Sequence, residues 1–597
     1  MSRPSRIRAI HRDRVAAYVE SAPGSIGAAP LAQAAVCRVA TDGLAANDGS
    51  TWALATTLLS ALGNANCDEI WVKAGVYKPV VPANAAAVTV PERAASFAIN
   101  RPLKLYGGFA GTETALNGRV LSSFNKTVLS GDIDDNDSNK IDGITPDAGD
   151  IAGSNSYHVV VIGGLTGDGN CQYTDSNTVL DGLTITGGYA NGAASGNPPH
   201  NWGGGLYCNG RGTGKASGPL LTHMAFIGNR AGDSGVAGYG GALYNDARFA
   251  GTSSPWLINV TFSGNAAAGT AIVNNASTAS SVARPKLLNV TLYHLDDSTT
   301  VMENWGAESD QGTNKGVSFP VVYLSIVWGK IKNTEFPAGT GTYTGRATFL
   351  YSIVKNSGCP AGCDPSVGNF LLSSNLSGDP LLSAATDHGG GTWTMLPGAG
   401  SPALDSPETS CGHYSSGLGY MVTTDQRSVS RPQGTGCDIG AVEWREGYEL
   451  KLNVGANGAI QIDGSAYPLT QSGPATVTMD LLGDSAGNRS SLRITATPNP
   501  GYHAVWPQTV TIDGATYGNA CADSAASLGG ASAYCYLTMD KARYAGVDFV
   551  NTYAVSYDGN GNTGGSVPAT QAKADGVDLT LATNSGNLTR TGYTFAG

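Results

Sequence analysis

Three segments of the chain can be aligned with one another, and this self-similarity constrains the fold more than any other feature. Each begins at a proline and carries a similar order of apolar and polar residues: Pro219–Asn229, Pro255–Asn265 and Pro285–Leu295. Gly-rich segments of a second kind lie between or before them, at Gly203–Asn209, Gly240–Asn245 and Gly269–Asn275. The starting prolines are 36 and 30 residues apart, which suits one or two coils of a solenoid. The repeat therefore predicts stacked units that cover one another's apolar faces.

Within each aligned segment the apolar residues alternate, as a strand with one buried face requires. The side predicted to be buried carries Ile258, Val260 and Phe262, with the aligned sets Leu288, Val290, Leu292 and Thr222, Met224, Phe226. His223, Asn259 and Asn289 are then predicted to face solvent. No sustained helical stripe runs from Leu180 to Val354. The pattern predicts an all-β parallel β-helix, right-handed by the general rule for parallel crossovers.

Motifs on both sides of the repeats resemble those of secreted bacterial right-handed parallel β-helix proteins, a group related to pectate-lyase-like and polymorphic outer-membrane repeats. Upstream these are Asn47–Trp52, Asp68–Tyr77, Leu105–Phe109 and Leu180–Gly188. Downstream, Gly378–Leu381, Ser401–Asp405 and Asp425–Glu443 resemble the choice-of-anchor-type region that ends such helices. The resemblance covers about residues 36 to 444. The resemblance implies the fold and an extracellular or cell-surface location, but it does not assign a catalytic role to any residue.

The character of the sequence changes after Glu443. Residues 448–550 resemble small all-β repeats of bacterial surface proteins, and residues 553–597 resemble a Listeria–Bacteroides (internalin B-type) repeat. That repeat normally continues with Trp beyond Gly597, so the chain is expected to stop inside a module. The predicted division is 1–35 as a leader or disordered segment, 36–375 as the β-helix, 376–446 as its choice-of-anchor-type C-terminal region, 447–550 as a small β module and 551–597 as an incomplete internalin B-type repeat.

Composition and charge narrow the class of partner. Gly contributes 82 of 597 residues and charged residues 14%, a composition that suits tight coils and disfavours helices. The net charge of −11 argues against a nucleic-acid or anionic-membrane partner. No run of about 18 apolar residues exists, so no transmembrane segment is predicted. We therefore expect a monomeric protein that binds a polysaccharide or a cell-surface partner.

The ten cysteines fall into neighbouring pairs along the sequence, and an even count in a loop-rich chain fits disulfides in an oxidising compartment. The hypothetical pairs are Cys37/Cys67, Cys171/Cys208, Cys359/Cys363, Cys411/Cys437 and Cys521/Cys535. Only Cys359 and Cys363 approach the spacing of zinc ligands, so zinc is disfavoured.

An acidic loop offers a possible calcium site. Asp132, Asp134, Asn136 and Asp137 alternate oxygen side chains, which hard cations prefer. The EF-hand pattern fails because Asp137 stands at the position that requires Gly. A plain solvated loop is the favoured interpretation, so no cofactor is predicted and calcium stays open.

Two functional hypotheses remain. A polysaccharide lyase or glycoside hydrolase acting on uronan-type polysaccharides would need paired carboxylates or a base with a cation. Candidates for those roles are His223, Asp233, Asp246, Arg248, His294, Asp296, Asp297 and Glu303. No complete motif of the pectin-hydrolysing relatives is present, and the favoured prediction is a non-catalytic adhesion or glycan-binding protein. Its binding candidates are aromatic residues near predicted corners, Trp202, Tyr239, Tyr293 and Trp305.

Overall fold

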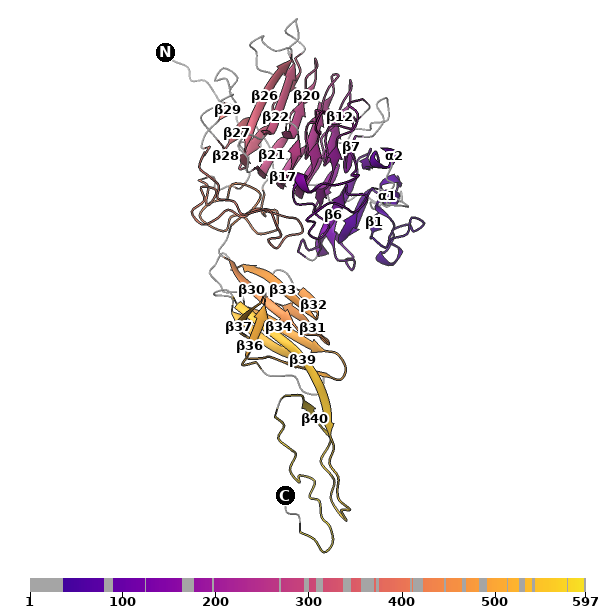
Figure 1. Ribbon diagram of the computed structural model, residues 1–597, viewed down its shortest axis with the longest axis vertical. Helices are drawn as coiled ribbons and strands as arrows, with labels where there is room; N and C mark the ends of the chain where they lie inside the picture. Colours follow the sequence, from indigo (N-terminus) through magenta and orange to yellow (C-terminus); the bar gives the residue numbers. More distant parts are fainter. Residues whose placement is uncertain are drawn as a thin grey trace, which may run out of the picture.

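The computed structural model describes residues 36–594, except 80–89, 124, 164–176, 196–197, 268–269, 295–299, 308–314, 337–344, 356–369, 372–374, 408–410, 412–421, 445–446, 464–468, 483–490, 513, 525–531, 539–542 and 577. A stack of strands forms the N-terminal part, and smaller sheets follow it along the chain (Figure 1). The predicted leader, residues 1–35, lies outside the described residues. No helix in the described ranges is long and apolar enough to cross a membrane.

The N-terminal part is a parallel β-helix, which confirms the predicted fold class. Within the described residues its largest sheet has 15 strands, β1 Val36–Val39, β2 Glu69–Lys73, β3 Gly75–Tyr77, β5 Lys104–Phe109, β6 Thr127–Ser130, β8 Val179–Asp181, β9 Thr184–Thr186, β13 Leu220–Ile227, β17 Trp256–Ser263, β21 Lys286–Tyr293, β24 Val321–Tyr323, β25 Ile326–Trp328, β27 Thr348–Leu350, β28 Ile353–Val354 and β29 Phe370–Leu371. The aligned repeats are strands β13, β17 and β21, which pair in parallel with Phe226 opposite Phe262 and Phe262 opposite Leu292.

Three more parallel sheets complete the coils. The seven-stranded sheet contains β4 Phe97–Ile99, β7 Val160–Ile162, β11 Leu206–Asn209, β15 Leu243–Asp246, β19 Thr270–Asn275, β22 Thr300–Ala307 and β26 Lys330–Phe336. The two small sheets contain β12 Ala216–Ser217, β16 Thr252–Ser253, β20 Val282–Ala283 and β23 Val317–Ser318, and β10 Tyr189–Ala190, β14 Arg230–Ala231 and β18 Ala266–Ala267. Short helical segments are η1 Trp52–Leu54, α1 Leu58–Gly63, α2 Val90–Arg93, η3 Leu116–Gly118 and η4 Ala148–Asp150.

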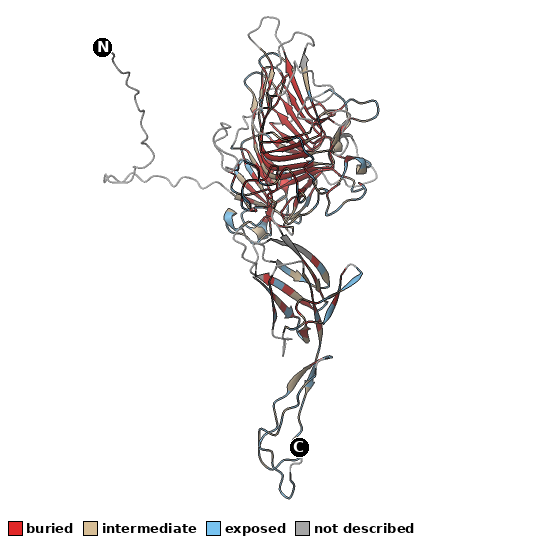
Figure 2. Ribbon diagram, turned by 90° about the vertical axis from the view of Figure 1, so that its left-hand side faces the viewer, coloured by how far each residue is buried: buried red, intermediate tan, exposed pale blue. Residues whose placement is uncertain are grey.

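Helix α1 packs against the first strands of the β-helix. Its N-cap is Thr57, whose hydroxyl oxygen accepts a hydrogen bond from the Ser60 amide at 3.2 Å. Leu58, Ala61 and Leu62 are buried in the same core cluster as the inward residues of the strands. Figure 2 shows the buried residues concentrated inside the β-helix.

A left-handed residue in the middle of each long strand changes which side chains are buried. His223, Asn259 and Asn289 have φ angles of 50°, 55° and 52°. A residue in this conformation interrupts the alternation of an extended strand. The prediction that Ile258, Val260 and Phe262 share one face is therefore wrong for Ile258. Leu257, Val260 and Phe262 belong to the central core, whereas Ile258 belongs to a cluster on the outer face.

The same shift applies in the neighbouring coil. Leu287, Val290 and Leu292 belong to the central core, and Leu288 joins Ile258 in the outer cluster. Leu221, Met224 and Phe226 are likewise in the core, whereas Thr222 is not fully buried. A single left-handed residue thus moves the residue before it from the predicted core face to the outer face.

The region from residue 376 to residue 444 packs on the outer face of the 15-stranded sheet. Ala403, Val422 and Ile439 are buried in one cluster with Ile258 and Leu288. Asn259 and Asn289 are consequently 1% and 0% exposed, so the prediction that this column faces solvent is wrong for both. The chain segment that follows the β-helix covers both asparagine side chains.

An asparagine ladder runs inside the seven-stranded sheet. Asn245, Asn274, Asn304 and Asn333 stand at aligned positions of successive strands. Each amide nitrogen donates to the oxygen of the next residue, at 2.7, 2.9 and 2.9 Å. Because unpaired polar groups are costly in a core, this chain of hydrogen bonds lets asparagine occupy inward positions.

Three of the predicted cysteine pairs form disulfides, Cys37–Cys67, Cys411–Cys437 and Cys521–Cys535. The predicted bond between Cys171 and Cys208 does not form, because Cys208 is a buried free thiol. Cys208 occupies the strand position aligned with Asn245, and its sulfur lies 3.0 Å from the Ser217 hydroxyl. Its inward orientation directs the thiol into the core. Cys171, Cys359 and Cys363 lie outside the described residues.

The C-terminal part is built from smaller, mainly antiparallel sheets. Its five-stranded sheet contains β30 Gly447–Val454, β33 Ala475–Leu482, β35 Tyr502–Val505, β39 Arg543–Val555 and β40 Gln571–Ala574. The four-stranded sheet contains β31 Gly458–Asp463, β32 Leu469–Ser472, β34 Ser491–Pro498 and β38 Ala533–Thr538, and a hairpin joins β36 Thr509–Ile512 to β37 Ala515–Gly518. Strand β39 runs without interruption across residues 550 and 551, where the sequence predicts a module boundary.

Candidate functional site

The outer face of the seven-stranded sheet gathers most of the aromatic binding candidates. Tyr207 and Tyr244 stand at aligned positions of β11 and β15 and point away from the central core. Their rings stack with centroids 5.5 Å apart and planes inclined by 5°. Both side chains are fully buried. They form a buried layer, the underlayer, that is covered by the residues just before β11 and β15.

Trp202 and Tyr239 lie over this underlayer. They form a parallel bridge between neighbouring coils, just before β11 and β15. Trp202 stacks on Tyr244 at 5.0 Å, and Tyr239 meets Trp305 edge-on at 4.9 Å. Trp202 and Tyr239 are half-buried, as the prediction of corner positions requires. We call Trp202, Tyr239, Tyr244 and Trp305 the aromatic cluster.

Two of the four aromatic candidates differ from the prediction of exposed corner residues. Trp305 lies within β22 and is only 8% exposed, because Tyr239 and Tyr244 pack against it edge-on. Tyr293 lies at the end of β21 in the 15-stranded sheet, so it does not belong to the aromatic cluster.

A buried ion pair supports the aromatic cluster. The guanidinium of Arg248 donates to both carboxylate oxygens of Asp246, at 2.9 and 2.7 Å, and lies 4.3 Å from the Trp202 ring centroid. The Tyr207 hydroxyl donates to the same carboxylate. Burial raises the pKa of Tyr207 well above its ordinary value, so this phenol stays protonated. Asp246 and Arg248 thus hold the aromatic rings in place.

Glu303 follows the tyrosines along the same outward column. Its carboxylate lies 2.6 Å from the Lys332 ammonium and accepts hydrogen bonds from the Thr270 and Thr334 hydroxyls, each at 3.0 Å. Its side chain is 3% exposed. With three intramolecular partners, Glu303 is suited to neutralising Lys332 within the sheet.

His223 belongs to a separate charged group that the sequence analysis did not assemble. Its Nδ1 lies 3.1 Å from the Asp181 carboxylate, whose other oxygen pairs with Arg119 at 2.8 Å. Burial raises the pKa of Asp181, but His223 and Arg119 outweigh it and hold the pKa below its ordinary value. The His223 side chain is 19% exposed, so the prediction that it lies open to solvent is wrong in degree. Arg119 and Asp181 carried no motif that would have indicated this group.

The other enzymatic candidates do not join His223 in a common site within the described residues. Asp233 accepts a hydrogen bond from the Tyr189 hydroxyl at 2.5 Å and pairs with Arg230 at 3.4 Å. The His294 amide donates to the Trp328 carbonyl at 3.0 Å. Asp296 and Asp297 lie outside the described residues.

A lysine of the acidic loop pairs with two of the loop's carboxylates. Lys140 lies 2.5 Å from Asp132 and 2.7 Å from Asp135. The side-chain amide of Asn136 donates to the Asp134 carboxylate at 3.0 Å. Among the described residues no group of three or more His, Cys, Asp or Glu is placed to hold a metal ion.

Asp137, the remaining calcium candidate, is also engaged within the loop. It accepts hydrogen bonds from the Thr145 hydroxyl and the Ala152 amide, at 2.7 and 2.8 Å. Burial raises its pKa to about 6. The contacts favour a structural role for the loop, and calcium remains the untested alternative to the predicted cofactor-free loop.

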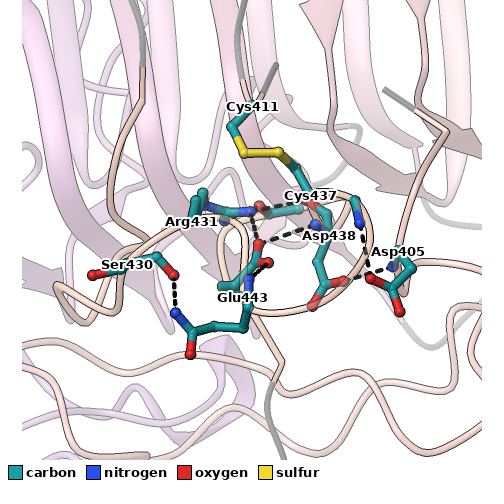
Figure 3. Close-up of a disulfide and its surroundings, with 10 residues drawn as sticks. Asp405, Cys411, Ser430, Arg431, Cys437, Asp438 and Glu443 are labelled. Atoms are coloured by element: carbon teal, nitrogen blue, oxygen red, sulfur yellow. Dashed lines mark hydrogen bonds and ion pairs between the residues drawn. A yellow bond between two sulfur atoms is a disulfide. The ribbon is translucent and has the colours of Figure 1, made fainter. Parts of the chain in front are cut away.

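The motif Asp425–Glu443 forms a buried charge network beside a disulfide (Figure 3). Arg431 donates to the Glu443 carboxylate at 2.8 Å and to the Asp438 and Gly440 carbonyls at 2.9 and 2.7 Å. Asp438 accepts a hydrogen bond from the Asp405 amide at 2.8 Å. Burial and the nearby Glu443 raise the pKa of Asp438 to about 7.

The same motif attaches this region to the β-helix. The Thr261 hydroxyl of β17 donates to the Gln426 side-chain oxygen at 2.7 Å. The Ala441 amide donates to the Thr291 hydroxyl of β21 at 3.0 Å. The residues that carry the sequence resemblance therefore have a structural role, because they fix the region on the 15-stranded sheet.

Comparisons with known proteins add little to this description. No known protein family and no curated protein matches the sequence. Among solved structures, pectate lyase Pel9A is similar with a TM-score of 0.28 and 13% identity, over 68% of this chain and 96% of that chain. A likeness at this level carries no argument, and the assignment of the fold rests on the parallel strand pairing.

Proposed function

We propose that this chain is a non-catalytic secreted or cell-surface protein whose β-helix binds polysaccharide. The observation that carries the proposal is the aromatic cluster. Trp202 and Tyr239 are partly exposed rings on neighbouring coils, and they rest on buried residues of a parallel sheet. Aromatic side chains give large, rigid contact surfaces at a small entropic cost, which suits stacking against sugar rings.

Charge and compartment support the same proposal. Asp246, Arg248 and Glu303 are paired with neighbours within the sheet, which favours a supporting role over proton transfer. Three disulfides fit an oxidising environment such as the cell exterior.

The alternative is a polysaccharide lyase or glycoside hydrolase. It is favoured by one observation, the partly exposed imidazole of His223 beside the Asp181 carboxylate. A carboxylate can orient an imidazole for general-base catalysis. The two functions differ in one measurable respect, because only an enzyme would shorten the polysaccharide.

The binding proposal is tested with the full chain on immobilised neutral and acidic polysaccharides. We expect Trp202→Ala to weaken binding about tenfold, equivalent to about 1.4 kcal/mol, because it removes a partly exposed ring that could stack on a sugar. The matched control is Trp256→Ala, which removes a half-buried tryptophan from β17 on the other large sheet and should leave binding unchanged. Thermal unfolding confirms that both variants fold. Equal losses in the two variants, or binding to none of the polysaccharides, would refute the proposal.

A further inference from the structure

An exposed phenylalanine lies at the corner of the β-helix that follows the aromatic cluster. Phe249 is 49% exposed and stands between β15 and β16. The Arg248 guanidinium carbon lies 4.3 Å from the Trp202 ring centroid and 5.8 Å from the Phe249 ring centroid. Because one guanidinium lies near both rings, the aromatic surface continues from the seven-stranded sheet to this corner.

The backbone of this corner is strained and is held by the next coil. Phe249 and Ala250 have φ angles of 61° and 62°, a region that bulky side chains rarely adopt. The Phe249 amide donates to the Thr278 hydroxyl at 2.5 Å, and the Ala250 amide donates to the Ser281 hydroxyl at 3.2 Å. Strain of this kind costs free energy and is concentrated at functional sites. Hydrogen bonds thus fix a strained corner that carries an exposed aromatic ring.

A guanidinium without a carboxylate partner lies over the same ring. Arg211, on the preceding coil, has its guanidinium carbon 4.5 Å from the Phe249 ring centroid. The two corners are joined by a hydrogen bond from the Gly212 amide to the Arg248 carbonyl at 2.9 Å. Among the described residues Arg211 forms no salt bridge, whereas the Asp246 carboxylate is occupied by Arg248. The charge of Arg211 is therefore available to a ligand.

Lys215 adds a second positive charge to this corner. Its amide donates to the Gly212 carbonyl at 2.9 Å, which closes a turn directly after Arg211. Within the part of the chain that the structure describes, Lys215 also forms no salt bridge. Both cations are half-buried, in a protein whose net charge is −11. A local positive surface on a negatively charged protein favours an anionic ligand at this place.

We propose that Arg211 and Phe249 extend the aromatic cluster into a binding surface for a carboxylate-bearing polysaccharide. Sugar rings stack on Trp202 and Tyr239, and a carboxylate of the glycan accepts two hydrogen bonds from the Arg211 guanidinium. Phe249 is a positioning residue, because its ring supports that guanidinium in one orientation. Lys215 adds a longer-range attraction. This inference rests on the function proposed above and adds the class of polysaccharide.

The test measures binding of the full chain to polygalacturonate and to its methyl ester, which carries no charge. We expect the native protein to bind the acidic polymer about fivefold more tightly than the ester. Arg211→Gln should abolish this preference and leave affinity for the ester unchanged. Adding Lys215→Gln should further weaken the salt dependence of binding to the acidic polymer. The matched control is Arg590→Gln, which removes an exposed guanidinium 4.5 Å from the Tyr593 ring centroid and should keep the full preference.

Phe249→Gly distinguishes positioning of Arg211 from a purely structural role of the ring. Glycine adopts the left-handed conformation without strain, so the melting temperature should be maintained although ring contacts are lost. The preference for the acidic polymer should nevertheless fall about threefold, because the guanidinium loses its support. A full preference in this variant would overturn the proposal.

The remaining outcomes separate this inference from the proposed function. Equal affinity of the native protein for the two polymers would overturn the inference, as would a preference that survives Arg211→Gln, and both leave polysaccharide binding established. Binding to neither polymer would overturn the inference together with its charge selection. Native affinity for both polymers in Trp202→Ala would instead count against the aromatic cluster on which both proposals rest.

Discussion

At the scale of single residues, Asp438 shows how the stability of the region from residue 376 to 444 depends on protonation. The carboxyl is buried beside Glu443 (Figure 3), and its pKa is raised to about 7. In an unfolded chain an aspartate has a pKa of about 3.9. Between these values the folded state keeps a proton that the unfolded state has lost. Stability from this group is therefore present at low pH and is lost as the pH rises through about 7.

This predicts that Asp438→Asn flattens the pH dependence of stability. The native protein should lose stability between pH 5 and pH 8, and the rise of the Asp438 pKa to about 7 sets an upper limit of roughly 3 kcal/mol on the part of that loss that this group causes. The variant should lose less, because its amide does not ionise. Thermal unfolding at both pH values measures the difference. Asp405→Asn, at an exposed carboxyl of the same network, is the control and should retain the native dependence. A steeper dependence in Asp438→Asn would contradict the account.

Single residues also explain where the sequence was misleading. The spacing of apolar residues predicts the strands and their repeat, but it also predicts that the alternation continues through His223, Asn259 and Asn289. Their left-handed backbone shifts the pattern by one residue, so Ile258 and Leu288 face outward. Asparagine tolerates this conformation better than most residues. The recurrence of Asn at aligned positions therefore indicates the bend, whereas alternation alone places these residues in a solvent-facing column.

At the scale of elements, the asparagine ladder joins four strands through their side chains. Asn274 is an internal member, because it accepts from Asn245 and donates to Asn304. Asn333 is at the end of the series and accepts from Asn304. Removing an internal member leaves two buried groups without their partners, and removing the end member leaves one.

Asn274→Ala should therefore destabilise the β-helix more than Asn333→Ala. A buried polar group without a partner costs about 1 to 3 kcal/mol, so the internal variant, which leaves two such groups, should lose roughly 2 to 6 kcal/mol and the end variant about half as much. Chemical denaturation followed by tryptophan fluorescence measures both. Equal stability of the two variants would show that the ladder hydrogen bonds contribute little.

The elements also show how far the candidate site could be predicted. The Gly-rich segments before β11 and β15 indicated corners, and Trp202 and Tyr239 do lie there. The sequence misplaces Trp305 because the turn-forming residues Asn304 and Gly306 flank it, whereas Thr300–Ala307 is one continuous strand. The disulfide between Cys171 and Cys208 is predicted only because these cysteines are neighbours in the sequence. Proximity in sequence does not show that the Cys208 side chain points into the core.

At the scale of the whole molecule, the region from residue 376 to 444 could be recognised by its motifs but not placed. Its contacts with β17 and β21 join residues more than 140 positions apart, for example Thr261 with Gln426 and Thr291 with Ala441. No local pattern encodes such contacts. Likewise the group of Arg119, Asp181 and His223 forms only when distant coils stack.

The central claim is that the protein holds a polysaccharide without cleaving it. The most direct measurement incubates the full chain with each polysaccharide that it retains, releases the polymer and compares its length, reducing ends and ultraviolet absorbance with those of untreated polymer. The account predicts saturable binding and recovery of polymer of unchanged length with no new reducing ends or unsaturated products. Shortened polymer with either new end, absent in His223→Ala, would contradict the account and establish an enzyme.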